Sequence, residues 1–146
     1  KLINDVLVEI LPEGKYLTAA YAHLNRKTLK LTLVNAGHPP AVYVPVDGPA
    51  RLIRMDGDIL GIFRDVIFEA RTLSVKPGDR IYLYSDGLVE SGLDRSVWPQ
   101  AAERMISACE AVRRQPIQAA PLRIRNILLP PEVPVEDDIV ILSIEI

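Results

Sequence analysis

The chain has 146 residues, of which 49% are hydrophobic and 25% are charged, and its net charge is −2 at pH 7. This composition is sufficient for one domain with a buried core, and the interspersed charges argue against a nucleic-acid-binding protein, which would need a basic face. The single Cys109 excludes an internal disulfide and the apolar runs are too short to cross a membrane, so we expect a single cytoplasmic domain over residues 1–146.

The first two-thirds of the chain predicts a helix followed by short strands. An amphipathic helix that packs through one face is indicated by four apolar residues at helical spacing: Ile3, Val6, Leu7 and Ile10. Residues 16–24 and 29–36 flank a polar turn and predict a β-hairpin. Further strands, separated by Asp-Gly and Pro-Gly turns, are predicted at 41–45, 50–54, 66–75 and 80–84. We expect these strands to form an antiparallel meander.

The last third of the chain changes to a helical pattern and ends in a strand. Residues 97–112 carry Ala, Met, Glu and Arg at helical density, and a second helical pattern runs from 116 to about 128. Pro130, Pro131 and Pro134 end that pattern. The closing sequence EDDIVILSIEI then predicts a final apolar strand that is preceded by an acidic pair.

A carboxylate directly follows the most strand-like run of the chain, in the sequence RIYLYSDGLVES at 80–91. There Asp86 is followed by Gly87, a residue that lets the backbone turn sharply or approach another group closely. The closing strand has a similar arrangement, with Asp137 and Asp138 at its beginning. If the two strands pair antiparallel, Asp86 faces Asp137 or Asp138.

Carboxylates that meet in a partly buried place need a cation or a proton to neutralise them. Mg²⁺ or Mn²⁺ suits this role, because hard divalent cations prefer carboxylate oxygens and often use only one or two of them together with waters. Aspartates beside glycine are also common in surface turns. From the spacing alone both interpretations are open, and the surface turn is the more frequent one.

A third group of residues lies in LVNAGHPPAVYV at 33–44. Here a stiff, glycine-hinged loop that begins at Asn35 interrupts two strands and carries His38. An imidazole can form hydrogen bonds, ligate a metal or transfer protons near neutral pH. A lone histidine in a loop is more often a simple turn residue, and this alternative also stays open.

Taken together, these residues resemble the bacterial metal-dependent serine/threonine phosphatases of the SpoIIE and RsbU kind, within the PPM superfamily. The resemblance runs almost from end to end. It depends on four ordered landmarks: the Thr18-Ala19 strand, the loop from Asn35 to His38, the Pro77-Gly78-Asp79 turn that leads to Ser85-Asp86-Gly87, and the Asp137-Asp138 pair. It implies an α+β fold, a layered α/β sandwich of two mainly antiparallel sheets flanked by helices, with two Mn²⁺ or Mg²⁺ ions at one end of a complete domain.

The resemblance also implies the site and the reaction. Two metal ligands are implied, Asp86 and Asp137. Four further residues are expected near the metal: Gly87, Asp138, His38 and Asn35. No side chain is assigned a covalent catalytic role, because paired metals activate water directly. The implied reaction is hydrolysis of phosphoserine or phosphothreonine on a regulatory protein, such as an anti-sigma factor antagonist, in bacterial signalling. An upstream sensor or receiver domain is the implied neighbour in the parent chain.

One part of the family pattern is missing from this sequence. The family normally has an Asp-x-x-Gly-His-Gly-like motif, whose Asp bridges both metals, and nothing before Thr18 matches it. Either the chain is the C-terminal part of a phosphatase and is inactive by itself, or it is a non-catalytic pseudophosphatase module that binds a protein. We take the first alternative as the prediction. Missing strands would also leave a bare sheet edge, which favours a dimer.

Overall fold

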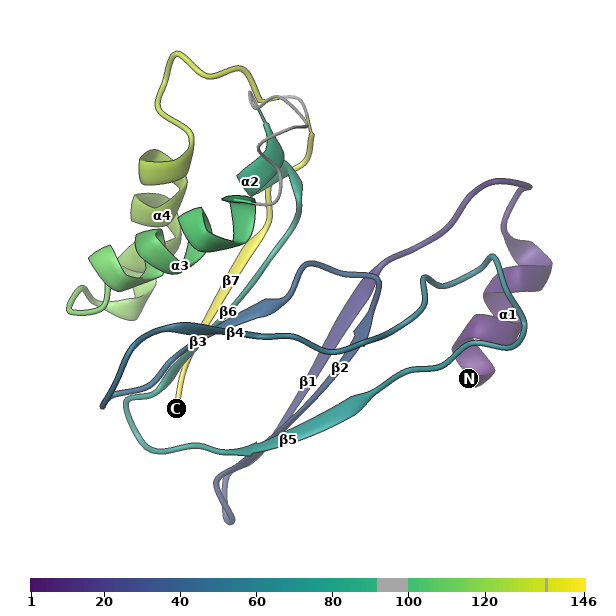
Figure 1. Ribbon diagram of the computed structural model, residues 1–146, viewed down its shortest axis with the longest axis horizontal. Helices are drawn as coiled ribbons and strands as arrows, with labels where there is room; N and C mark the ends of the chain where they lie inside the picture. The colour runs from purple at the N-terminus through teal and green to yellow at the C-terminus, as the bar shows by residue number, and fades with distance from the viewer. Residues whose placement is uncertain (92–99, 136) are drawn as a thin grey trace. The chain divides into compact units, whose positions relative to one another are not determined.

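The computed structural model describes residues 1–91, 100–135 and 137–146, and Figure 1 labels its elements. The chain divides into two compact units, which we describe separately: residues 1–38 with 54–74, and residues 39–53 with 75–146. Each unit has one antiparallel sheet and its own helix or helices. The predicted pair of antiparallel sheets with flanking helices is therefore confirmed, while the single domain over 1–146 stays a prediction.

The sheet of the first unit has the strand order β1-β2-β5 and is antiparallel throughout. Its strands are β1 (Ala19–Asn25), β2 (Lys30–Ala36) and β5 (Ala70–Ser74). Strands β1 and β2 form the predicted hairpin, whose turn is held by Asn25 Oδ1 accepting two backbone N–H groups, each at 3.1 Å. Along β2 the side chains of Leu31 and Leu33 are buried, as the period of two in the sequence predicts.

The predicted first helix forms as α1 (Leu2–Ile10), but only Leu7 of its four predicted apolar side chains is partly covered. Three of those side chains are largely exposed: Ile3 (71%), Val6 (55%) and Ile10 (67%). The helix is held instead by the fully buried Asn4, whose Nδ2 donates to Phe63 O at 2.8 Å and whose Oδ1 accepts from the Gly61 N–H at 3.0 Å. Periodicity identifies a helix, but neighbouring segments decide which side chains are covered.

The sheet of the second unit has the strand order β4-β3-β6-β7 and is also antiparallel. Its strands are β3 (Ala41–Val44), β4 (Arg51–Ile53), β6 (Arg80–Tyr84) and β7 (Ile141–Glu145). The predicted meander is wrong, because β5 pairs with β2 and β6 pairs with β3. Turn residues determine where each strand ends, whereas the burial of a strand determines which other strands it pairs with. Strand β3 is buried along its whole length between two neighbours, and β5 is mostly exposed.

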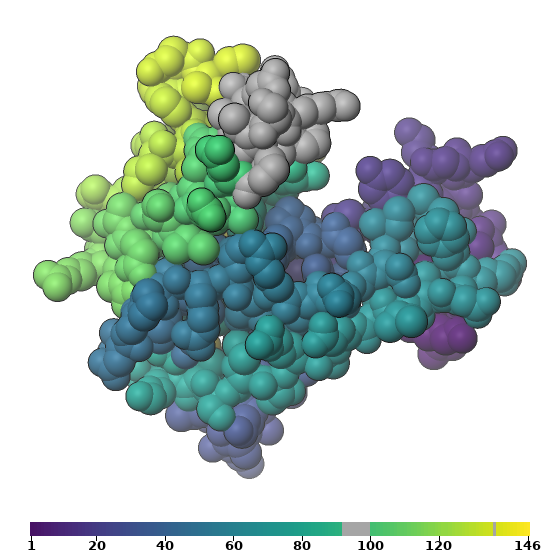
Figure 2. Space-filling view, viewed as in Figure 1, coloured from purple at the N-terminus to yellow at the C-terminus, as the bar shows by residue number. Residues whose placement is uncertain are grey.

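Helices cover one face of this second sheet (Figure 1). They are α2 (Gly87–Glu90), α3 (Ala101–Ala111), the short 3-10 helix η2 (Ile117–Ala119) and α4 (Ala120–Leu128). The core lies between helices and sheet and includes five fully buried residues: Val42, Tyr82, Met105, Cys109 and Ile124. Figure 2 shows the outer surface of α3 and α4 in green.

The element boundaries differ from the predicted ones in several places. Strand β5 covers only the second half of the predicted 66–75 strand. Helix α3 confirms the predicted 97–112 helix from residue 101, and the part at 97–99 lies outside the described residues. The predicted 116–128 helix is divided into η2 and α4. Over the ranges that the structure describes, no helix is long and apolar enough to cross a membrane.

Candidate functional site

Strands β6 and β7 are antiparallel neighbours whose register places Tyr84 opposite Ile141. The C-terminal end of β6 therefore lies beside the beginning of β7, which confirms the predicted pairing (Figure 1). Beyond the two strands the pairing continues for one more step, because the Ser85 N–H donates to Val140 O at 3.0 Å. The two segments that carry the predicted metal ligands thus leave the sheet at the same place.

The side chain of Ser85 joins these two segments. Its Oγ donates a hydrogen bond to Asp138 O at 2.8 Å and accepts one from the Val140 N–H, also at 2.8 Å. Both partners belong to the stretch that leads from the acidic pair into β7. The sequence identifies Ser85 only as part of a motif, so its contacts are a finding of the structure.

Gly87 allows the two segments to approach each other closely. A Cβ atom at this position would lie 2.7 Å from Asp138 O and 3.1 Å from Asp137 Cβ. A side chain would therefore push the segments apart, and glycine is the residue that tolerates such an approach. Helix α2 begins at the same point, where Asp86 Oδ1 accepts a hydrogen bond from the Gly87 N–H at 3.1 Å.

The three aspartates of the site are exposed. Asp137 Oδ1 accepts a hydrogen bond from the Asp138 N–H at 2.7 Å, and within the described residues neither Asp86 nor Asp137 forms an ion pair. Carboxylates on two contacting segments fit a hard divalent cation whose other ligands are waters. Outside the undescribed positions 92–99 and 136, no three His, Cys, Asp or Glu side chains are grouped to hold a metal. Exposed aspartates on contacting segments are donors that suit such a cation, and Asp86 and Asp137 as its ligands stay a prediction.

The His38 loop belongs to the first unit and is held by its own residues. Asn35 Nδ2 donates to His38 O at 2.9 Å and Asn35 Oδ1 accepts from the His38 N–H at 3.1 Å. The imidazole Nδ1 lies 3.1 Å from Thr18 Oγ1. The Asn35 amide thus shapes the loop, and a location of His38 and Asn35 near the aspartates stays a prediction.

The sequence identifies Asp79 only as a turn residue, whereas the structure buries it. It is 1% exposed and accepts hydrogen bonds from Tyr43 Oη at 2.5 Å, the Lys76 N–H at 2.7 Å and the Val46 N–H at 2.8 Å. Burial opposes ionisation of this carboxyl, yet the three hydrogen bonds keep its pKa below the ordinary value. Asp79 precedes β6 and Asp86 follows it, so this buried carboxylate is not part of the candidate site.

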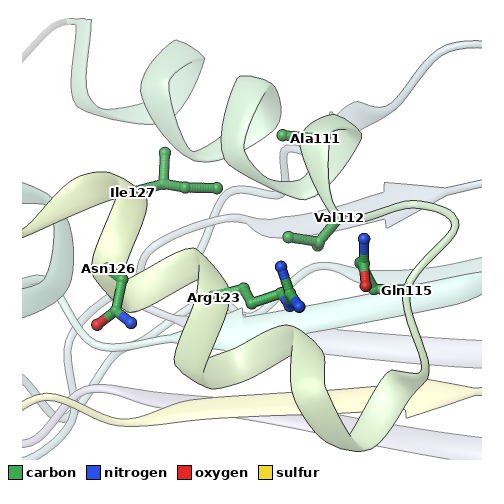
Figure 3. Close-up of a pocket in the computed structure, with 6 residues that line it drawn as sticks. All are labelled: Ala111, Val112, Gln115, Arg123, Asn126 and Ile127. Carbon is green, nitrogen blue, oxygen red and sulfur yellow. The ribbon is translucent and has the colours of Figure 1, made fainter.

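A pocket of about 280 Å³ lies between α3 and α4 (Figure 3). It is lined by Ala111, Val112, Gln115, Arg123, Asn126 and Ile127. Arg123 extends from α4 towards the end of α3. The lining that the structure describes has no acidic side chain, so this pocket does not suit a divalent cation.

Comparison with known proteins assigns the chain to a family. Residues 1–146 match the family model described as Stage II sporulation protein E (SpoIIE). The chain belongs to the SpoIIE family. This membership confirms the resemblance that the Ser85-Asp86-Gly87 and Asp137-Asp138 motifs indicate in the sequence.

Two curated relatives of this SpoIIE-family chain come from Bacillus subtilis (strain 168). The phosphoserine phosphatase RsbP is 33% identical over 75 residues, which are 51% of this chain and 19% of RsbP. The phosphoserine phosphatase RsbU is 30% identical over 91 residues, which are 62% of this chain and 27% of RsbU. The chain therefore matches well under half the length of either relative.

Solved structures confirm the predicted PPM-type fold of the SpoIIE-family chain. The RsbU and RsbW domains of a Mycobacterium tuberculosis protein superpose with a TM-score of 0.81 at 22% identity, covering 97% of this chain and 40% of that one. The phosphatase domain of SpoIIE from Bacillus subtilis, presoaked with Mn, gives a TM-score of 0.73 at 17% identity, covering 99% of this chain and 63% of that one. At such identities the likeness concerns the fold.

Proposed function

We propose that the protein hydrolyses phosphoserine or phosphothreonine on a regulatory protein, with Mn²⁺ or Mg²⁺ as cofactor. One observation supports this proposal above all. In a chain of the SpoIIE family, the Ser85-Asp86-Gly87 segment contacts the Asp137-Asp138 segment. Both curated relatives are named phosphoserine phosphatases, which supports the proposal by similarity.

Asp86 and Asp137 are the proposed metal ligands, and Asp138 and Gly87 lie beside them. A bound divalent cation would activate water and neutralise charge on the phosphoryl oxygens. The chain itself supplies two negative charges at an exposed place, which a phosphorylated side chain can reach from solvent. The Mn-presoaked SpoIIE domain supports the choice of metal.

We propose that Asp86 and Asp137 would hold one of the two cations of a complete domain. A second cation needs ligands beyond Asp86 and Asp137. With one cation, the attacking water would be less activated and the phosphoryl group would have less charge stabilisation, an effect of several kcal/mol. Residues 1–146 alone are therefore expected to be inactive compared with a complete phosphatase domain.

The proposed partners follow from the family. They are a phosphorylated regulatory protein, such as an anti-sigma factor antagonist, and a sensor or receiver domain in the parent chain. We also propose a cytoplasmic location and a dimer that forms through an unpaired sheet edge. His38 and Asn35 stay proposed as residues near the site, with Asn35 holding the loop that carries His38.

A second candidate function is a non-catalytic pseudophosphatase module that binds a protein. It is favoured by one observation: in the described ranges, no group of three or more metal-ligating side chains is present. A module of this kind would retain the fold and the exposed aspartates without supporting turnover.

The test is Mn²⁺-dependent release of phosphate from a phosphoprotein by the complete protein and its Asp86→Asn and Asp137→Asn variants. Each variant removes one ligand charge at nearly constant volume, so we expect turnover to fall about 100-fold or more. Asp47→Asn is the matched control, because Asp47 lies in the same unit and is exposed in a surface ion pair with Lys76. Unchanged turnover in both site variants would show that these residues are not the ligands. A wild-type protein that binds the phosphoprotein without releasing phosphate would support the binding module.

A further inference from the structure

The contacts of Ser85 lie where β6 becomes α2, so this residue must satisfy two geometries at once. One residue beyond the last pair of the β6–β7 register, Ser85 is opposite Val140, and the Ser85 N–H donates to Val140 O at 3.0 Å. In a regular antiparallel ladder the Ser85 carbonyl would accept the Val140 N–H in return. Here that carbonyl is used differently, because it accepts the Leu88 N–H of α2 at 3.2 Å.

The hydroxyl of Ser85 takes the place of the missing carbonyl. It accepts the Val140 N–H at 2.8 Å and donates its own proton to Asp138 O at 2.8 Å. The side chain therefore completes the ladder and also holds the backbone of the acidic pair. An alanine at this position would leave both Val140 N–H and Asp138 O without this partner.

We infer that Ser85 is the positioning residue of the candidate metal site, because its hydroxyl holds the Asp137-Asp138 segment against Asp86. This inference rests on the proposed function for the identity of the ligands. It assigns Ser85 no contact with metal or substrate. Ser85 acts through the backbone of the acidic pair, together with Gly87, where a Cβ would lie 2.7 Å from Asp138 O.

The experiment compares three variants with the wild-type protein. Ser85→Ala removes the hydroxyl, and Ser85→Thr keeps it at a partly exposed position. Ser143→Ala is the matched control, because Ser143 belongs to the same strand pair and its Oγ contacts Ile117 O at 3.4 Å, away from the aspartates.

The first measurement is Mn²⁺ binding, followed by electron paramagnetic resonance of the free ion. We expect Ser85→Ala to bind Mn²⁺ about tenfold more weakly or worse, which is the usual effect of losing a residue that orients a metal ligand. Ser85→Thr and Ser143→Ala should stay within about threefold of the wild type. Equal affinity in Ser85→Ala and the wild type, or an equal loss in Ser143→Ala, would overturn the inference.

The second measurement needs no metal. Nuclear Overhauser contacts between the Gly87 α protons and Asp137 report directly on the approach of the two segments. We expect them in the wild type, Ser85→Thr and Ser143→Ala and expect their loss in Ser85→Ala. Their retention in Ser85→Ala would overturn the inference. A wild-type protein that shows these contacts and binds no Mn²⁺ would contradict the proposed function and leave the role of Ser85 to be decided by this second measurement.

Discussion

Two aspartates lie at the two ends of strand β6, and the structure places them in opposite environments. Asp79 precedes the strand and is 1% exposed, and its carboxylate accepts three hydrogen bonds, one of them from Tyr43. Asp86 follows the strand and is exposed, and its carboxylate accepts a hydrogen bond from the N–H of the next residue. Each stands beside a glycine in the sequence, so local composition does not separate them.

The two carboxylates differ in burial, and burial decides whether a carboxylate binds groups of its own fold or stays accessible to a ligand. Three protein donors reach the buried carboxylate of Asp79, and these hydrogen bonds stabilise the charge that burial would otherwise disfavour. Asp86 keeps its carboxylate at the surface, and the next residue, Gly87, lies against a second acidic segment, which is where we propose that a cation binds. Stability experiments should therefore respond to Asp79, and metal-binding experiments to Asp86.

The largest expected effect on stability comes from Asp79→Asn. The amide nitrogen would replace an oxygen that faces hydrogen-bond donors, and hydrogen bonds to charged groups contribute about 1.5–3 kcal/mol each. We expect the free energy of unfolding, measured with urea at pH 7, to fall by about 3 kcal/mol. A loss below about 1 kcal/mol would show that the Asp79 charge matters little for the fold.

The same variant tests the acid dependence of stability. Because the folded-state pKa of Asp79 is depressed, its contribution is complete above the ordinary aspartate pKa of about 4 and disappears as the pH falls through the folded-state value. The stability difference between wild type and Asp79→Asn should therefore shrink when urea unfolding is repeated at decreasing pH below 4. A constant difference over that range would contradict the assigned cause.

Gly87→Ala tests the opposite end of β6, where Asp86 lies. The new Cβ would contact Asp138 O and Asp137 Cβ, and forcing extra atoms into a close contact costs about 1–3 kcal/mol. We expect a smaller stability loss than in Asp79→Asn together with weaker Mn²⁺ binding. Titration with Mn²⁺ and urea unfolding measure the two effects. Wild-type affinity in this variant would show that the distance between the segments does not control the metal.

Tyr43→Phe should produce a smaller effect of about 1 kcal/mol, because it removes one hydrogen bond to Asp79. Burial and that hydrogen bond raise the pKa of Tyr43 to about 12, so its contribution is complete below pH 10 and is lost as the pH rises towards 12. Alkaline unfolding curves should therefore converge for wild type and Tyr43→Phe over this range. Parallel curves would contradict the prediction.

Asp86→Asn should have the smallest effect on stability, within about 0.5 kcal/mol, since the residue is exposed and keeps an acceptor for the Gly87 N–H. Thermal unfolding in the absence of metal measures this. A loss comparable to that of Asp79→Asn would remove the contrast between the two ends of β6.

The sequence alone determines much of the local structure and part of the candidate site. The hairpin around Asn25 follows from alternation and turn chemistry, which act between residues that are close in the chain. The meeting of the Ser85-Asp86-Gly87 segment with the Asp137-Asp138 segment follows from two strands that carry acidic residues at opposite ends, once antiparallel pairing is assumed.

The tertiary structure decided the features that depend on distant neighbours. The pairing of β5 with β2 and of β6 with β3, the exposure of the apolar side chains of α1 and the burial of Asp79 are all set by segments far apart in the chain. Ser85 is one more case, because the role of its hydroxyl depends on Val140 and Asp138. A sequence pattern records the preferences of each residue, whereas burial and hydrogen bonding depend on which partners the whole fold brings into contact.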